Sequence, residues 1–184
     1  MSLTAEDAQD VLDNSDCLYS KKDVEQAITR LSLEITEKLR DKNPIILCVM
    51  KGGLVPTGML VTRLNFPLQI DYLHATRYRG KTTGGDLNWL AKPQFDLRDR
   101  VVLVIDDILD EGVTLKEILD YCKQQGVKEL YSAVLVEKLH DRKTGEKHAD
   151  FIGLQVADRY VFGYGMDYKG FLRNAPGIYA VKGQ

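Results

Sequence analysis

The sequence predicts an α/β protein built on a central, mainly parallel β-sheet flanked by helices. The strongest support is the apolar run at residues 101–105, which has the character of a strand buried on both faces in the middle of a parallel sheet. Apolar side chains then recur at helical spacing, at Leu115, Ile118, Leu119 and Cys122. Between strand and helix lies an acidic loop, at the place where open α/β sheets bind their ligands.

Length and composition indicate an ordinary globular chain. The 184 residues, of which 44% are hydrophobic and 28% charged, fit a single domain over residues 1–184 with room for a core. A net charge of −2 gives no electrostatic support to a nucleic-acid partner. The N-terminus lacks an apolar signal segment, and no apolar run is long enough to cross a bilayer. We therefore expect neither a nucleic acid nor a membrane as partner.

The cysteines indicate the compartment. Cys17, Cys48 and Cys122 form no closely spaced pair, and the last two fall at apolar positions, where a buried free thiol is the usual state. This pattern favours a reducing compartment, and we expect a cytoplasmic protein.

Two helices are predicted at the start of the chain. Thr4 and Asp7 have the spacing of a capping box at the start of a short helix over residues 4–13. Ser20 and Asp23 have the same spacing before a longer helix, whose apolar stripe continues to Leu39. Both helices are expected to serve as scaffold.

The next segment reads as strand, loop and helix. Residues 45–50 are apolar, Lys51-Gly52-Gly53 follows, and Pro56 suits the first turn of a helix that continues to about residue 64. A lysine between a buried strand and two glycines is a plausible anion-binding loop, but on these residues alone a plain strand-to-helix turn is the better interpretation. Residues 68–76 alternate and predict another strand.

Residues 77–93 break the core pattern with three glycines and four basic residues. Unstructured loops of this length are usually functional or disordered. Trp89 falls inside this stretch or at its hinge, and the alternative is a Trp89 anchored in the core beside Leu90.

The acidic loop carries the clearest chemistry. Asp106 and Asp107 follow the buried strand directly, and Asp110 comes three residues later. Gly112 permits a tight turn into the following helix, whose free N–H groups and dipole favour an anion, and Thr114 adds a hydroxyl. Carboxylates beside a phosphate site can hold sugar hydroxyls or Mg²⁺, and a further carboxylate can move a proton. A response-regulator receiver also pairs acids after a strand, but near the start of its chain.

The last third predicts further strands at residues 128–136, 151–156 and 178–181. Lys138 comes just past the first of these strands. The loop at residues 140–149 contains two histidines that are too far from other ligands in the sequence to predict a metal site. Residues 158–168 are rich in aromatic side chains, and for Phe162 and Tyr164 the expected role is core packing.

These motifs together resemble the type I phosphoribosyltransferases, and most closely their hypoxanthine-guanine branch. The Lys-Gly-Gly loop, the acidic loop, the strand-end lysine and an aromatic segment followed by Asp167 and Arg173 occur in the family's order over residues 45–181. The resemblance implies the type I phosphoribosyltransferase fold, with its core at about residues 20–157. It also implies a small hood, formed by N-terminal residues and residues 158–184, and a flexible lid at residues 77–93.

The resemblance assigns roles on the donor side. It implies that Asp106 and Asp107 hold the ribose hydroxyls of phosphoribosyl pyrophosphate, directly or through Mg²⁺. It places Asp110 as the general base. It implies that the 5′-phosphate is wrapped by Glu111, Gly112, Val113 and Thr114. It also implies a pyrophosphate loop at Lys51 and Gly52, with a non-proline cis peptide between Met50 and Lys51.

On the purine side, the resemblance places Lys138 on the 6-oxygen of the base. It places the Tyr160 ring against the base and the Val161 backbone at the base edge. It implies that Asp167 binds a Mg²⁺ that also touches pyrophosphate, and that Arg173 holds pyrophosphate. The chain departs from the family at three positions: it has Glu111 where Thr is common, Val113 where Lys or Arg is common, and Arg77 where a hydroxyl residue is usual.

The expected activity is purine salvage: hypoxanthine or guanine plus phosphoribosyl pyrophosphate gives IMP or GMP plus pyrophosphate, with Mg²⁺. A homodimer or homotetramer is expected. One alternative is a regulatory relative that binds nucleotide only as an effector, which the presence of Asp110 and the net charge disfavour. A second is a xanthine-preferring transferase, which Lys138 and Tyr160 do not exclude.

Overall fold

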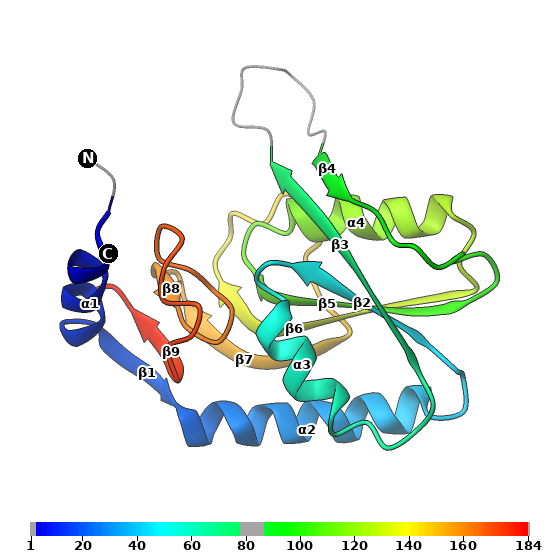
Figure 1. The fold of residues 1–184 in the computed structure, drawn as a ribbon, viewed down its shortest axis with the longest axis horizontal. Helices are drawn as coiled ribbons and strands as arrows, with labels where there is room; N and C mark the ends of the chain where they lie inside the picture. Colours follow the sequence, from blue (N-terminus) through cyan, green and yellow to red (C-terminus); the bar gives the residue numbers. More distant parts are fainter. Residues whose placement is uncertain (1–2, 78–86, 184) are drawn as a thin grey trace.

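The computed structural model describes residues 3–77 and 87–183, and its main feature is a six-stranded sheet (Figure 1). The strand order is β4-β3-β2-β5-β6-β7, in which only the β3–β4 pair is antiparallel. The strands are β2 (Ile45–Met50), β3 (Gln69–Arg77), β4 (Leu87–Ala91), β5 (Val101–Leu109), β6 (Glu129–Leu139) and β7 (Phe151–Ala157). The predicted α/β class with a mainly parallel sheet is confirmed.

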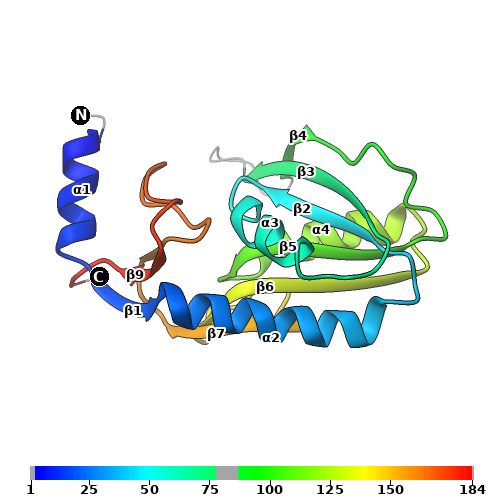
Figure 2. The same cartoon turned by 60° about the horizontal axis from the view of Figure 1, so that its bottom comes forward.

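Helices cover both faces of this sheet. Helices α2 (Lys21–Leu39) and α3 (Leu54–Val61) pack on one face, and α4 (Val113–Gln124) packs on the other (Figures 1 and 2). Strand β5 shows the division: Leu103 belongs to the core beneath α2 and α3, and Val104 belongs to the core beneath α4. Burial of both faces explains the continuous apolar run of this strand.

A second, smaller sheet stands at one end of the molecule (Figure 2). It has the strand order β1-β9-β8, in which β1 (Asp16–Ser20), β9 (Gly177–Ala180) and β8 (Val161–Phe162) pair antiparallel. The sequence analysis missed β1, because its five residues carry no apolar run or clean alternation. Helix α1 (Ala5–Asp13) lies beside this sheet.

The two capping boxes are confirmed. The Thr4 hydroxyl accepts from the Asp7 N–H at 3.1 Å, and the Ser20 hydroxyl accepts from the Asp23 N–H at 3.4 Å. In return each carboxylate accepts the backbone N–H of its capping residue at 2.9 Å. These hydrogen bonds lower the pKa of both carboxyls, since they favour the charged form.

Three strand boundaries differ from prediction. Strands β5 and β6 continue through Asp107 and Lys138, which the sequence analysis placed beyond their ends. Residues 87–91 form β4, so the unstructured loop predicted at residues 77–93 is wrong over this part, and residues 78–86 lie outside the described residues. Trp89 packs against Tyr121 of α4 with ring centroids 4.6 Å apart, and this contact anchors the short strand to the helix.

Within residues 3–77 and 87–183, no helix has the length and apolar character needed to cross a membrane.

Candidate active site

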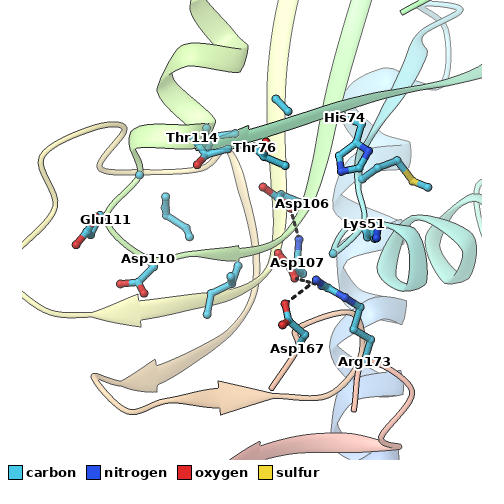
Figure 3. Close-up of a pocket in the computed structure, with 17 residues that line it drawn as sticks. Lys51, His74, Thr76, Asp106, Asp107, Asp110, Glu111, Thr114, Asp167 and Arg173 are labelled. Atoms are coloured by element: carbon cyan, nitrogen blue, oxygen red, sulfur yellow. Dashed lines mark hydrogen bonds and ion pairs between the residues drawn. The ribbon is translucent and has the colours of Figure 1, made fainter. Parts of the chain in front are cut away.

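A cavity of about 940 Å³ lies where β2, β3 and β5 end and meet the loop between β8 and β9 (Figure 3). Ten of the predicted site residues line it: Lys51, Gly52, Asp106, Asp107, Asp110, Glu111, Gly112, Thr114, Asp167 and Arg173. Four do not: Val113, Lys138, Tyr160 and Val161. Residues from four separate segments of the chain therefore meet in one site, at the carboxyl edge of the sheet.

Two adjacent carboxylates form the floor of the cavity. Asp106 and Asp107 occupy the last part of β5 and are each only 9% exposed. The Asp107 N–H donates to Asp106 Oδ1 at 2.9 Å. Burial and the neighbouring charge of Asp107 raise the pKa of Asp106 well above its usual value, because both effects penalise a second buried negative charge.

Arg173 joins the acidic pair to the hood. Its Nη2 atom lies 2.5 Å from Asp167 Oδ1, and its Nη1 atom lies 3.9 Å from Asp107 Oδ2 (Figure 3). Nη1 also donates to the carbonyl of Gly165 at 2.6 Å. The guanidinium is thus held by the hood loop and directed at the end of β5, as its fork of donors allows.

The loop after β2 approaches the acidic pair very closely. A Cβ atom on Gly52 would lie 2.0 Å from Asp107 Oδ2, so any larger residue here would displace the Asp107 carboxylate. The preceding peptide, Met50–Lys51, is cis, which confirms the expectation from the family resemblance. Lys51 itself is exposed and lines the cavity.

The loop after β5 supplies backbone donors. Gly112 has φ +78°, a conformation that side chains rarely adopt, and α4 starts at the next residue. The first N–H groups of α4 and its dipole therefore lie beside Thr114 and the cavity. From behind, the N–H groups of Thr144 and Gly145 donate to the Glu111 carbonyl, each at 3.1 Å. The loop between β6 and β7 thus supports this turn.

Asp110 has two partners at the end of β6. Lys138 Nζ donates to Asp110 Oδ2 at 2.9 Å, and His140 Nε2 lies 2.7 Å from Asp110 Oδ1. Burial raises the pKa of the Asp110 carboxyl, but the hydrogen bonds from Lys138 and His140 outweigh this, so the net pKa is lowered. Lys138 does not line the cavity but reaches it through this carboxylate.

His140 corrects an expectation from the sequence. The histidines of residues 140–149 were expected to lie away from other ligating side chains, yet Asp110, His140 and Asp158 bring their ligand atoms within 4.8 Å of one another. A signal was present: His140 stands two residues after Lys138, and side chains with this spacing project to the same side of a strand end.

The predicted aromatic residues lie outside the cavity lining. Tyr160 is 39% exposed, and its ring meets Tyr168 edge to face at 5.5 Å. The Val161 backbone pairs with Ala180 in the small sheet. Phe162 and Tyr164 are buried, as predicted.

Strand β3 adds residues that the sequence analysis did not assign to the site. His74, Ala75 and Thr76 line the cavity at the end of β3 (Figure 3). The pairing of β3 with β2 brings His74 opposite Met50, and no motif in the sequence indicates this proximity.

The donor set suits a hard divalent cation. Asp106 and Asp107 provide adjacent buried carboxylates, with the Arg173 guanidinium 3.9 Å from Asp107, and Asp167 adds a third carboxylate to the cavity lining. A bound Mg²⁺ would relieve the repulsion that raises the pKa of Asp106. The residues therefore fit the ion.

The chain is similar in sequence to known phosphoribosyltransferases. The family model of the phosphoribosyl transferase domain matches residues 14–169. The hypoxanthine-guanine-xanthine phosphoribosyltransferase of Tritrichomonas foetus is 32% identical over 90% of each chain. The hypoxanthine-guanine phosphoribosyltransferase of Bacillus subtilis is 30% identical over 90% of this chain and 92% of its own.

The fold is also similar to those of solved phosphoribosyltransferase structures. The hypoxanthine phosphoribosyltransferase of Staphylococcus aureus superposes with a TM-score of 0.87, at 27% identity, over 93% of this chain and 94% of its own. A hypoxanthine-guanine-xanthine phosphoribosyltransferase gives 0.81, at 29% identity, over 93% and 97%. With its mainly parallel sheet, its acidic strand end and these relatives, the chain belongs to the type I phosphoribosyltransferases, in their hypoxanthine-guanine branch.

Proposed function

We propose that this protein is a purine salvage transferase. It converts hypoxanthine or guanine plus phosphoribosyl pyrophosphate to IMP or GMP plus pyrophosphate. The bond from C1′ of the ribose to pyrophosphate breaks, the bond from C1′ to purine N9 forms, and the proton on N7 leaves the base. The observation that carries the proposal is one cavity that combines the buried Asp106–Asp107 pair, the Gly112 turn at the start of α4, and Asp110.

The donor is held by charge and by backbone amides. Asp106 and Asp107 bind the ribose hydroxyls, and the turn at residues 111–114 receives the 5′-phosphate through N–H groups and the Thr114 hydroxyl. Glu111 and Val113 stand where the family commonly has Thr and a cation, so backbone amides carry more of this contact here.

The leaving pyrophosphate meets cationic groups. Lys51 and the Gly52 backbone bind it from the β2 side, and Arg173 binds it from the hood. Mg²⁺ held by Asp106, Asp107 and Asp167 would neutralise charge on pyrophosphate as it departs. Asp167 now pairs with Arg173 at 2.5 Å, so these two side chains would separate when pyrophosphate and the ion are bound.

The purine occupies the side of the site next to Lys138. Lys138 donates to the 6-oxygen, the Tyr160 ring stacks on the base, and the Val161 backbone reads its edge. Asp110 accepts the N7 proton as general base. The support for this placement is the 2.9 Å contact between Lys138 and Asp110, because it brings the 6-oxygen donor and the proton acceptor together, as the adjacent O6 and N7 atoms of a purine require.

We extend the proposal to assembly and location. Residues 1–184 act as one domain, because hood and sheet residues line the same cavity. The protein forms a homodimer or homotetramer and works in the cytoplasm, where its free thiols Cys17, Cys48 and Cys122 stay reduced.

A steady-state assay with a panel of bases tests the proposal. Hypoxanthine, guanine, xanthine, adenine and orotate are each supplied with phosphoribosyl pyrophosphate, with Mg²⁺ and with EDTA. We expect turnover of the 6-oxopurines that depends on Mg²⁺, and none of orotate. Equal or better turnover of orotate or adenine would contradict the role of Lys138, and donor binding without turnover of any base would favour a regulatory protein.

A further inference from the structure

The carboxylate of Asp110 is held at both oxygens by different kinds of donor. Oδ1 lies 2.7 Å from His140 Nε2, and Oδ2 lies 2.9 Å from Lys138 Nζ. The His140 side chain is 5% exposed, and the Asp110 side chain is 39% exposed. Oδ1 is therefore held by the buried His140 ring, and Oδ2 by the Lys138 ammonium group.

The hydrogen bonds of His140 define its tautomer. The backbone N–H of Arg142 donates to His140 Nδ1 at 3.0 Å, so Nδ1 must present a lone pair. The ring proton then resides on Nε2, where it points at Asp110 Oδ1. His140 is thus arranged as a neutral donor whose orientation is fixed by the chain two residues later.

Cations already occupy the space around this cluster, which disfavours a metal there. Lys138 Nζ lies 3.9 Å from Asp158 Oδ1 in addition to its contact with Asp110. Arg142 donates to both oxygens of Asp158, at 2.7 and 2.6 Å, and lies 3.7 Å from Glu111. These charges face Asp110 and His140 from β6, the following loop and the hood segment.

We propose that His140 is a positioning residue that anchors Asp110 through Oδ1 and leaves Oδ2 as the atom that accepts the purine proton. The inference rests on the proposed function and deepens it. When a purine binds, Lys138 turns from Oδ2 to the 6-oxygen of the base, and Oδ2 becomes free beside N7. His140 stays on Oδ1, so the carboxylate keeps its direction when its cationic partner leaves.

This arrangement couples base strength to substrate. In the free protein the hydrogen bond from Lys138 helps to lower the pKa of Asp110. When the Lys138 side chain moves from Asp110 to the 6-oxygen of the purine, Asp110 loses this hydrogen bond. Asp110 is then a stronger proton acceptor at the moment of reaction. His140, as a neutral donor, orients the carboxylate without neutralising it.

Three variants of His140 separate orientation from simple packing. His140→Gln places an amide N–H near the position of Nε2 and should keep the bond to Oδ1. His140→Asn is too short to reach Asp110, and His140→Ala has no donor. His148→Ala is the matched control, since His148 is exposed in the same loop. Each variant is assayed with hypoxanthine and phosphoribosyl pyrophosphate across pH, and its melting temperature is recorded.

The inference predicts a specific pattern. His140→Ala and His140→Asn should lower kcat by roughly 10- to 100-fold, the worth of one hydrogen bond to a charged group, with the donor KM within about twofold of wild type. The acid limb of the kcat profile should move to higher pH, because Asp110 loses a donor that favours its charged form. His140→Gln should recover most of the rate, and NMR of labelled imidazole nitrogens should report the Nε2–H tautomer at His140.

Other results would overturn the role of His140. These are an unchanged kcat in His140→Ala, no recovery in His140→Gln, or an Nδ1–H tautomer. A parallel fall of kcat, donor affinity and melting temperature would indicate a merely structural residue. If the wild type turned over no 6-oxopurine, the proposed function would fail and this inference with it. A fully active wild type with unaffected variants would remove this inference alone.

Discussion

Asp110 is the residue to which we assign the proton transfer. It lines the cavity beyond the Asp106–Asp107 pair, and hydrogen bonds from Lys138 and His140 lower the pKa of its carboxyl. We expect Asp110→Asn to fold and bind the donor, yet to lose roughly 10²- to 10⁴-fold in kcat, the usual worth of a general base. Steady-state kinetics with hypoxanthine measure this. Asp141→Asn, an exposed acid in the neighbouring loop, is the control and should keep its rate; near-normal turnover by Asp110→Asn would exclude Asp110 as the base.

Asp106 illustrates the conflict between function and stability. Its carboxylate is buried beside Asp107, and its pKa is raised well above the usual value by burial and by that neighbour. The Asp106 carboxyl therefore binds its proton more tightly in the folded protein than in the unfolded chain. The ionised Asp106 side chain destabilises the fold, and this destabilisation grows as pH rises through the pKa of the folded state. Asp106→Asn should stabilise the metal-free protein by about 1 kcal/mol at neutral pH, because the amide oxygen can still accept the Asp107 N–H.

Thermal melts at pH 5 and pH 8 without Mg²⁺ measure this effect, and the gain should be larger at pH 8. Asp120→Asn is a contrasting control. Asp120 lies on the surface beside Lys116, whose hydrogen bond lowers the pKa of its carboxyl, so its substitution should produce no gain. A lower melting temperature for Asp106→Asn at both pH values would contradict the interpretation of the acidic pair.

Single residues were predictable where they belong to a compact motif. The acidic pair, Gly112 and the Lys51 loop lie in short contiguous stretches, and all of them reach the cavity. His140 and His74 were missed because their roles come from contacts across the sheet. Such contacts depend on strand order and register, which spacing along the chain does not specify.

At the scale of elements, the turn before α4 depends on a tight contact between two loops. A Cβ atom on Gly112 would lie 1.9 Å from the Glu146 carbonyl oxygen, and φ is +78° there. We expect Gly112→Ala to cost roughly 3 kcal/mol or more in the free energy of unfolding, through both clash and strained backbone. Affinity for the donor should fall as well, since we assign the 5′-phosphate to the backbone amides of this turn.

Gly126 offers a matched control for this prediction. It has φ +77°, and a Cβ there would meet only Arg98 Cγ, at 3.7 Å. Gly126→Ala should therefore lower the free energy of unfolding by about 1–2 kcal/mol, because only the left-handed backbone conformation opposes it. Donor affinity should be unchanged. Equal losses for both variants in chemical denaturation would show that the contact with Glu146 contributes nothing.

Strand β4 shows where element prediction fails. The glycine-rich and basic composition of residues 77–93 indicated a loop, but Trp89 packs on Tyr121 and Lys92 Nζ lies 5.8 Å from the Trp89 ring centroid. Tertiary packing therefore overrides local composition at residues 87–91. Of the two alternatives for Trp89, the structure agrees with the one in which its ring is anchored against the core.

For the whole molecule, an apolar face points to self-association. Leu54, Ile70, Tyr72 and Phe95 are 41–54% exposed and border a cavity of about 480 Å³ on α3 and β3. Contiguous exposed apolar side chains of this kind often mark interfaces. We expect Tyr72→Glu to lower the oligomeric state measured by sedimentation velocity. Leu33→Glu, at an exposed apolar residue on α2, should leave it unchanged, and an unaffected Tyr72→Glu assembly would place the interface elsewhere.

The fold class was predictable because its signals are strong and repeated. Apolar strands buried on both faces, such as residues 101–105, leave few alternatives to a covered parallel sheet. The small sheet was not predictable in detail, since β1 and β9 are distant in sequence and pair only in the folded chain. The loop between β8 and β9 carries Asp167 and Arg173 to the cavity, so this part of the cavity lining depends on the least predictable element.

The central claim is transfer of a phosphoribosyl group to a 6-oxopurine, and ³¹P NMR of the reaction tests it most directly. Enzyme, Mg²⁺, phosphoribosyl pyrophosphate and hypoxanthine are mixed, with Asp110→Asn as the matched control. We predict that the donor signals give way to pyrophosphate and a 5′-nucleotide in equal amounts, and only slowly with the variant. Release of ribose 5-phosphate in place of nucleotide, or a donor that persists although it is bound, would contradict the claim.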